Sequence, residues 1–245
     1  MRIMTTSPDE TKPGRIILEK YAKIASLQNV DVLLLPSSFL PYYKNTNHFY
    51  VNSRILNLPT SIKDCPNLLV ITGVNEESGY ENTAHFKTVV AFNSSKIINI
   101  HRKVDLEQHY IEKGFFCGSG DDFSFTYNDC IFRTLECYES LFDKNYGPCD
   151  ISFVSIGFGM QAKTDNYNCD YFDEWLTILR TMAIRHQCWI VTSCNAVHKD
   201  IMTVIISRNG EVVGMAKNKG ILIQDIDLNE FKQWKQPYEQ NISDT

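Results

Sequence analysis

Residues 31–36, DVLLLP, decide the class of fold that the sequence predicts. The run is apolar without interruption, which is typical of a strand covered on both faces. Just before it, residues 13–29 (PGRIILEKYAKIASLQN) place Ile17, Tyr21 and Ile24 at helical spacing. An amphipathic helix that leads directly into a buried strand indicates a layered α/β domain.

Segments of the same two kinds continue to the C-terminus. A second helix is predicted over residues 170–187, with Trp175, Leu179 and Met182 on one face. Further runs with strand character cover residues 67–74, 86–93, 96–104, 130–137, 150–156, 188–194, 201–207, 211–216 and 220–226. Many strands and few helices favour layers over a barrel of eight equal units. We find no repeat or linker, so we predict one domain over residues 1–235 and a polar tail over residues 236–245.

The composition excludes several classes of function. The chain has 24 Lys and Arg against 29 Asp and Glu, a net charge of -5, which gives no electrostatic footprint for nucleic acid or an anionic membrane. No apolar run approaches the roughly 18 residues of a membrane span. The start, MRIMTTSPDETKPG, lacks the apolar region of a signal peptide. We therefore expect a cytoplasmic protein whose eight cysteines are reduced, and no Cys or His spacing resembles a metal site.

Cys137 is the first candidate for chemistry. It ends the predicted strand 130–137, so its sulfur is expected at the carboxyl end of a strand, where open α/β sheets bind ligands. The backbone N–H of Tyr138 would then be placed to stabilise an oxyanion. The alternative is a buried cysteine that acts as a small hydrophobe, which position alone favours.

Two other candidate sites lie at the ends of predicted strands. Lys103 closes the run 96–104, and a lysine in a closed pocket can hold a neighbouring thiol as thiolate, although taken alone it reads as a surface lysine. Ser37 and Ser38 follow DVLLLP. No G-x-S-x-G motif and no histidine in a triad setting accompany them, which argues against a serine nucleophile.

In chain order, these pieces resemble the nitrilase superfamily, the carbon–nitrogen hydrolases. PSSFLPYY resembles that family's Pro-Glu-x-Phe-x-x-x-Tyr segment, HRKVDL its Lys-x-x-Leu segment, and LECYESLF its Cys-Tyr-Asp/Glu segment. A Trp-containing helix and strand and a closing hairpin also match, and the likeness spans about residues 1–232. The matching segments are residues 36–43, 101–106, 135–142, 174–197 and 207–228.

The resemblance implies a four-layer α-β-β-α sandwich and a reaction that attacks an amide or nitrile carbon through a cysteine thioester. It gives Cys137 the role of nucleophile and Lys103 that of holding thiolate and oxyanion. Glu112, in QHYIEKGFF, matches a glutamate that positions substrate and lysine, and Tyr138 and Glu139 lie beside the nucleophile. It implies a small amide-like substrate or ligand, a homodimer, and no metal or organic cofactor.

The sequence departs from the family at Ser37, which stands where a catalytic glutamate follows Pro36. A serine has no proton affinity near neutral pH, so we expect weak or altered activity unless Glu112 or Glu139 substitutes, and we expect Ser37→Glu to restore catalysis. Two hypotheses stay open at this point. The protein is either a hydrolase with a reassigned base or a catalytically inactive nitrilase-like protein that binds a small ligand or a protein partner.

Overall fold

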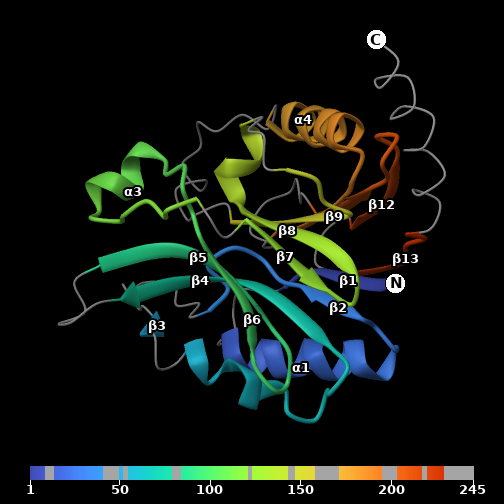
Figure 1. The fold of residues 1–245 in the computed structure, drawn as a ribbon, viewed down its shortest axis with the longest axis horizontal. Helices are drawn as coiled ribbons and strands as arrows, with labels where there is room; N and C mark the ends of the chain where they lie inside the picture. The colour runs from blue at the N-terminus through green and yellow to red at the C-terminus, as the bar shows by residue number, and fades with distance from the viewer. Residues whose placement is uncertain are drawn as a thin grey trace.

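Two mixed β-sheets lie face to face in a computed structural model of the chain (Figure 1). The structure describes residues 1–8, 14–40, 50–51, 55–78, 84–120, 123–142, 147–157, 171–194, 203–216 and 220–228. The predicted tail at residues 236–245 lies outside the described residues. The single-domain boundary at residue 235 therefore stays a prediction.

The first sheet contains the strands of the first part of the chain together with β13, the last strand, and the second sheet contains β7 to β12. The first has the order β13 (Gly220–Asp225), β1 (Arg2–Ser7), β2 (Val32–Leu34), β4 (Leu69–Ser78), β5 (Ala84–Phe92) and β6 (Ile97–Arg102), with β3 (Tyr50–Val51) paired to β4. The second has the order β12 (Val212–Ala216), β11 (Thr203–Ile206), β10 (Trp189–Cys194), β9 (Ile151–Ile156), β8 (Cys130–Glu136) and β7 (Ser124–Tyr127). The parallel strands are β1, β2, β3 and β4 in the first sheet and β8, β9 and β10 in the second.

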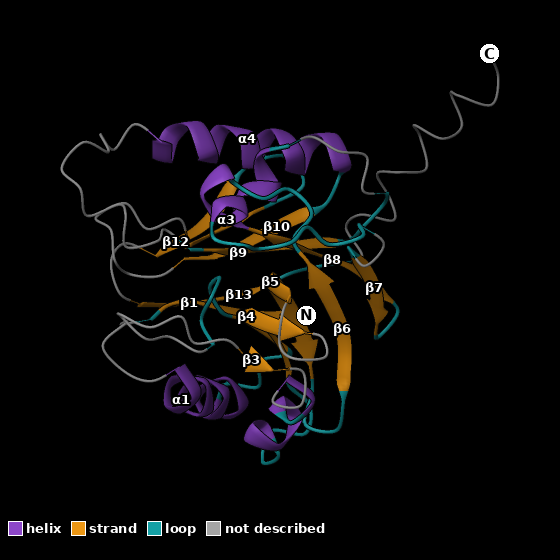
Figure 2. Cartoon of the chain, turned by 90° about the vertical axis from the view of Figure 1, so that its left-hand side faces the viewer, coloured by secondary structure: helices purple, strands orange, loops and turns teal. Residues whose placement is uncertain are grey.

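Helices cover the two outer faces (Figure 2). Helix α1 (Gly14–Leu27) packs on the first sheet and α4 (Tyr171–His186) on the second, which confirms the predicted α-β-β-α sandwich. The shorter helices are η1 (Leu58–Ile62), α3 (Gln108–Glu112) and η2 (Cys137–Leu141). None of the helices in the described part of the chain is long and apolar enough to cross a membrane.

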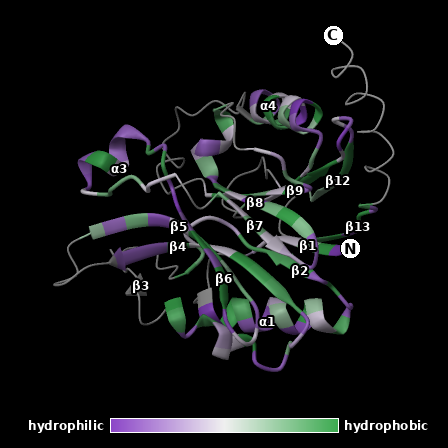
Figure 3. Ribbon diagram, in the orientation of Figure 1, coloured by the Kyte–Doolittle hydropathy of each residue, from purple (hydrophilic) through white to green (hydrophobic). Residues whose placement is uncertain are grey.

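Residues 32–36 of the run DVLLLP are all apolar because β2 is buried on both faces. Leu33 packs in the apolar layer under α1, whereas Val32 and Leu34 pack between the two sheets. A third apolar layer lies under α4 and includes Trp175 and Leu179, as the helical spacing predicted. In Figure 3, hydrophobic residues (green) colour much of the strands in the interior of the molecule. Each sheet is therefore held on both sides, and the ends of its parallel strands are fixed relative to those of the other sheet.

Candidate active site

Cys137 lies at a sharp turn where β8 ends and η2 begins. Its φ of 51° is in the left-handed region, which residues other than glycine seldom adopt and which is frequent at functional sites. The turn aims the sulfur at the end of β9, where the thiol donates to the carbonyl oxygen of Gly157 at 3.7 Å. The structure thus places the sulfur at the carboxyl end of a strand, as the sequence predicted.

Lys103 is a buried lysine, not a surface one. It follows β6 directly, and its side chain is 1% exposed. Its backbone N–H donates to the carbonyl of Lys87 at 2.7 Å, and its Nζ donates to Oε2 of Glu107 at 2.7 Å. The ammonium is therefore held in a fixed place inside the protein.

Glu139 ties the end of β8 to the end of β6. Its Oε1 accepts a hydrogen bond from the backbone N–H of Val104 at 2.5 Å. Its Oε2 lies 2.9 Å from Nε2 of His101 and accepts from the backbone N–H of Glu136 at 2.8 Å. Both oxygens of this fully buried carboxylate are engaged, so Glu139 holds together the two strand ends that carry Lys103 and the thiol.

The glutamate that touches the lysine is Glu107, which comes four residues after it. Glu112, named from the resemblance, is exposed at the end of α3 and accepts a hydrogen bond from Gln108 at 3.3 Å. Tyr138 packs edge-on against Phe142, with ring centroids 4.8 Å apart. The structure therefore brings the predicted Lys103, Tyr138 and Glu139 together with Cys137 where β6 and β8 end, and leaves Glu112 at the surface.

Ser37 meets a carboxylate that sequence reasoning missed. The buried Ser37 hydroxyl donates to Oε1 of Glu136, which is itself buried. Oε2 of Glu136 has no hydrogen-bond partner among the described residues. One signal in the sequence could have found it. Glu136 is a charged residue that comes directly before Cys137, and the two residues between it and Arg133 are uncharged.

The backbone around Ser37 is packed against two glycines. A Cβ built on Gly73 would lie 2.5 Å from the Cα of Ser37, and one on Gly157 would lie 2.9 Å from its Cβ. With Glu136 beside it as well, position 37 has little space for a larger side chain. The expectation that Ser37→Glu restores catalysis therefore does not fit this packing, because a second carboxylate would enter a place that already holds one.

A second buried lysine supports the turn after β2. Nζ of Lys87 donates to Oγ of Ser38 at 2.6 Å and to Oδ1 of Asn75 at 2.8 Å. The same nitrogen lies 4.4 Å from the ring centroid of Tyr110, a cation–π distance. Ser38 has a φ of 51°, so the lysine fixes a turn that the backbone alone would disfavour.

Burial and neighbouring charges shift the pKa values of the groups in this cluster in opposite directions. Burial raises the pKa of Cys137 to about 11, more than the charge of Lys103 lowers it, so the expected acidic thiol is not found. Burial alone would lower the pKa of Lys103, but the net pKa is raised because Cys137, Glu107 and Glu136 all favour its charged form. The resting site therefore holds a protonated thiol beside a protonated lysine.

The pKa of Glu136 lies near neutral pH, where a carboxylate can act as a proton acceptor. Burial raises its pKa to about 7, although Lys103, Lys87 and the Ser37 hydroxyl favour the ionised form. Burial lowers the pKa of Lys87 to about 8, against the attraction of Glu136. Near neutral pH the carboxyl is thus close to half ionised, which suits a general base.

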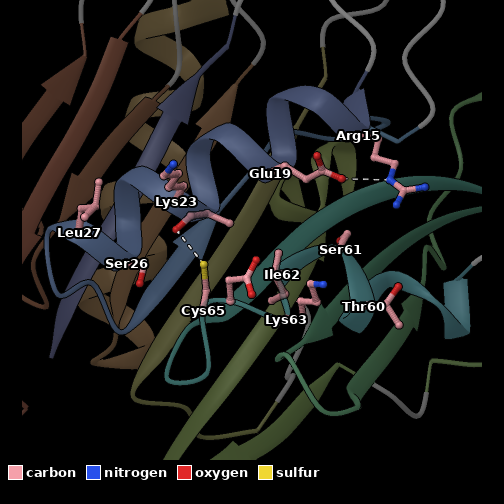
Figure 4. Close-up of a pocket in the computed structure, with 12 residues that line it drawn as sticks. Arg15, Glu19, Lys23, Ser26, Leu27, Thr60, Ser61, Ile62, Lys63 and Cys65 are labelled. Atoms are coloured by element: carbon pink, nitrogen blue, oxygen red, sulfur yellow. Dashed lines mark hydrogen bonds and ion pairs between the residues drawn. The ribbon is translucent and has the colours of Figure 1, made fainter.

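Neither a ligand cluster for a metal nor a second reactive centre emerges elsewhere in the described residues. No three His, Cys, Asp or Glu side chains among them are grouped as a metal site. A hollow of about 790 Å³ lies between α1 and η1 (Figure 4), and its wall mixes acidic and basic side chains. The buried Cys65 at this hollow donates to the carbonyl of Ala22 at 3.5 Å, and burial raises its pKa. The chemistry of the described residues is therefore concentrated around Cys137.

The sandwich and the Cys–Lys–Glu cluster at its strand ends define a hydrolase-like α/β protein. The chain matches the sequence profile of the family Carbon-nitrogen hydrolase over residues 4–236 and belongs to that family. Among curated proteins, no sequence matches it.

Solved structures share the fold at low sequence identity. A carbon–nitrogen hydrolase from Helicobacter pylori G27 has a TM-score of 0.77 at 15% identity, covering 98% of this chain and 93% of its own. A mutant amidase of the nitrilase superfamily from Nesterenkonia AN1 has a TM-score of 0.75 at 14% identity, covering 98% and 96%. The glutamine-dependent NAD+ synthetase of Acinetobacter baumannii has a TM-score of 0.77 at 14% identity. It covers 94% of this chain, which spans 46% of that larger protein.

Proposed function

We propose that the protein is a thiol-dependent hydrolase of amides, with Cys137 as the nucleophile. The observation that carries the proposal is the Cys137 thiol at a strained strand end beside the buried ammonium of Lys103. A glutamate-to-glutamine mutant of the amidase from Nesterenkonia sp. AN1, with a TM-score of 0.74 to this chain, carries the acetamide moiety of fluoroacetamide covalently at its active-site cysteine. That likeness of fold supports the same role for Cys137.

The geometry suggests how the groups would act. The sulfur attacks the carbonyl carbon, and the oxyanion that forms is stabilised by the Lys103 ammonium and the N–H of Tyr138. The C–N bond breaks to give an amine and a thioester on Cys137, which water hydrolyses. Glu107 keeps the ammonium in place through its 2.7 Å contact and is here the positioning carboxylate, in place of Glu112.

The thiol needs a base for this chemistry. With a pKa of about 11, roughly one thiol in ten thousand is ionised at pH 7. This is the physical reason to expect weak activity if nothing removes the proton during attack.

The test is ammonia release from a panel of simple amides and ω-amides, with a second arm of nitriles, for wild type and Cys137→Ala. We expect release by the wild type and none by the variant, with both folded by circular dichroism. Equal rates for the two proteins would contradict the proposal.

A second candidate is a catalytically inactive protein that binds an amide-like ligand. The high pKa of the Cys137 thiol and the serine at position 37 favour it. A folded wild type that binds amides in calorimetry without releasing ammonia would support this candidate. The homodimer stays a prediction, which a light-scattering mass of twice 28.2 kDa would support.

A further inference from the structure

We propose that Glu136 is the general base and acid of this site. A carboxylate from β8 would thus replace the one that is missing at position 37. The proposal rests on the proposed function and names the residue that moves the protons. It differs from the sequence-based expectation, in which Glu112 or Glu139 would substitute.

The side chain of Glu136 lies on the face of β8 that meets the other sheet. Alternate residues of a strand share a face, and Phe132, four positions earlier, packs in the apolar layer between the sheets. The hydrogen bond from Ser37 confirms this direction, since Ser37 follows β2 in the opposite sheet. The carboxylate therefore crosses the space between the sheets to the segment where the related hydrolases carry theirs.

The Glu136 side chain accepts hydrogen bonds from Ser37 and, in a capping box, from the backbone N–H of Glu139, yet one of its oxygens has no partner among the described residues. Oε1 accepts from Ser37, and Oε2 is a buried acceptor without a partner among the described residues. Leaving a buried carboxylate oxygen unpaired is costly, and such atoms in native structures call for an explanation. A proton acceptor for the neighbouring thiol is the explanation that we infer.

The other nearby carboxylates differ from Glu136 in their contacts or in their exposure. Both oxygens of Glu139 accept hydrogen bonds or face His101, and Oε2 of Glu107 accepts from Lys103. Glu112 is exposed at the surface. Of Glu107, Glu136 and Glu139, Glu136 is therefore the one with a fully buried oxygen that has no partner among the described residues.

Two buried lysines make an ionised Glu136 tolerable. The charges of Lys103 and Lys87 both act on it, while Ser37 supplies a hydrogen bond. A buried carboxylate with such partners can lose and regain a proton without leaving an unpaired charge in the core. Ser37 has the role of orienting the carboxylate through its hydroxyl.

The proton movements balance over one turnover. In acylation, Glu136 takes the thiol proton while sulfur bonds to the carbonyl carbon, and it returns that proton to the leaving nitrogen as the C–N bond breaks. In deacylation, it takes a proton from the attacking water and returns it to the sulfur as the C–S bond breaks. The sum is an amide and water giving an acid and an amine, with the enzyme unchanged.

The experiment measures the alkylation of Cys137 by iodoacetamide between pH 6 and 9, using mass spectrometry of the peptide that carries it. The proteins are wild type, Glu136→Gln, and the exchange variant Ser37→Glu/Glu136→Ser. Glu211→Gln, an exposed carboxylate on the turn before β12, is the matched control and should alkylate like the wild type.

A purely electrostatic role of Glu136 and a role as base predict opposite changes in the alkylation rate of Cys137. Its negative charge raises the pKa of Cys137, so a purely electrostatic role predicts faster alkylation after Glu136→Gln. A base predicts slower alkylation at pH 7, by about tenfold or more, and loss of an inflection near pH 7. Equal or faster alkylation in the folded variant would overturn the proposal.

The exchange variant decides the matter if Glu136→Gln fails to fold. An alkylation rate within a few-fold of wild type supports a base at this place. A folded exchange variant that is alkylated at least about tenfold more slowly than wild type at pH 7 overturns it. Alkylation needs no amide turnover. A wild type that releases no ammonia therefore contradicts the proposed function alone, and ammonia release that is unaffected by Glu136→Gln contradicts the base alone.

Discussion

The hydroxyl of Ser37 donates a hydrogen bond to Oε1 of Glu136, and this contact joins the segment after β2 in one sheet to the end of β8 in the other. It places a buried carboxylate beside Ser37, the position at which the sequence resemblance leads one to expect a catalytic glutamate. Cys137 follows Glu136 directly in the chain, so the same strand delivers both the sulfur and the group that takes its proton.

Ser37→Glu alone is expected to destabilise the protein rather than activate it. The new carboxylate would face Glu136 in a space already limited by Gly73 and Gly157. Burying a second charge there should lower the free energy of unfolding by about 2–4 kcal/mol. Urea denaturation measures this, and Ser37→Ala, which adds no bulk, is the control. A Ser37→Glu protein that is as stable as wild type and more active would contradict the assignment of Glu136.

Activity is expected to rise with pH through about 7. The carboxyl of Glu136, whose pKa burial raises to about 7, accepts a proton only when it is ionised. On the acid side, kcat/KM for an amide should fall about tenfold per pH unit. Glu136→Gln should remove this limb, and a wild-type profile that is flat between pH 5 and 8 would refute the prediction.

The free energy of unfolding should fall with rising pH, opposite to the activity, because of the same carboxyl group of Glu136. A carboxyl whose pKa is raised in the folded state, here from 4.5 to about 7, holds its proton more tightly when folded than when unfolded. Its contribution to stability is therefore present below pH 4.5 and is lost as the pH rises through about 7. Denaturation at pH 5 and pH 8 should show a smaller difference in Glu136→Gln than in wild type.

Glu107→Gln should impair turnover more than Glu112→Gln. Glu107 holds Nζ of Lys103 at 2.7 Å, whereas Glu112 is exposed and contacts Gln108. Removing the charge beside Lys103 loosens the ammonium and lowers its pKa, so kcat should fall by about tenfold or more. Steady-state kinetics of both variants decide the matter. A larger loss in Glu112→Gln would return the positioning role to the residue that the resemblance named.

Gly157→Ala should weaken the contact between Ser37 and Glu136. The added methyl would lie 2.9 Å from the Cβ of Ser37 and 3.0 Å from its Oγ, so the hydroxyl must shift. We expect a loss of about 1–3 kcal/mol in unfolding free energy and a fall in kcat. Gly214→Ala is the matched control, because its methyl meets the flexible end of Leu222 at 3.1 Å. Equal effects of the two substitutions would count against a special role for this packing.

The layers of the fold were accessible to sequence reasoning because their strands are apolar on both faces. All ten predicted runs become strands, but β1, β3 and β7 were missed. In β1, Thr5 and Ser7 are polar yet buried, since Thr5 donates to the carbonyl of Thr192 at 2.6 Å and the Ser7 and Thr203 hydroxyls lie 2.6 Å apart. Such bonds between segments far apart in sequence leave no hydrophobic pattern to detect.

The site was only partly accessible for a similar reason. The strand-end position of Cys137 and Lys103 follows from local pattern and from the resemblance. The partnership of Ser37 with Glu136 joins residues 99 positions apart on different sheets, and it depends on how the two sheets meet. The choice of Glu107 over Glu112 depends on where the chain turns after Lys103, which spacing alone does not fix.

The most direct test of the account is to trap the covalent intermediate on Cys137. Wild type mixed with an activated amide and quenched in acid within the first turnovers should gain the mass of one acyl group, located by peptide mapping on Cys137. The Cys137→Ala variant should gain none. A rapid release of ammonia without any acyl adduct, or an adduct on another cysteine, would contradict the thiol mechanism.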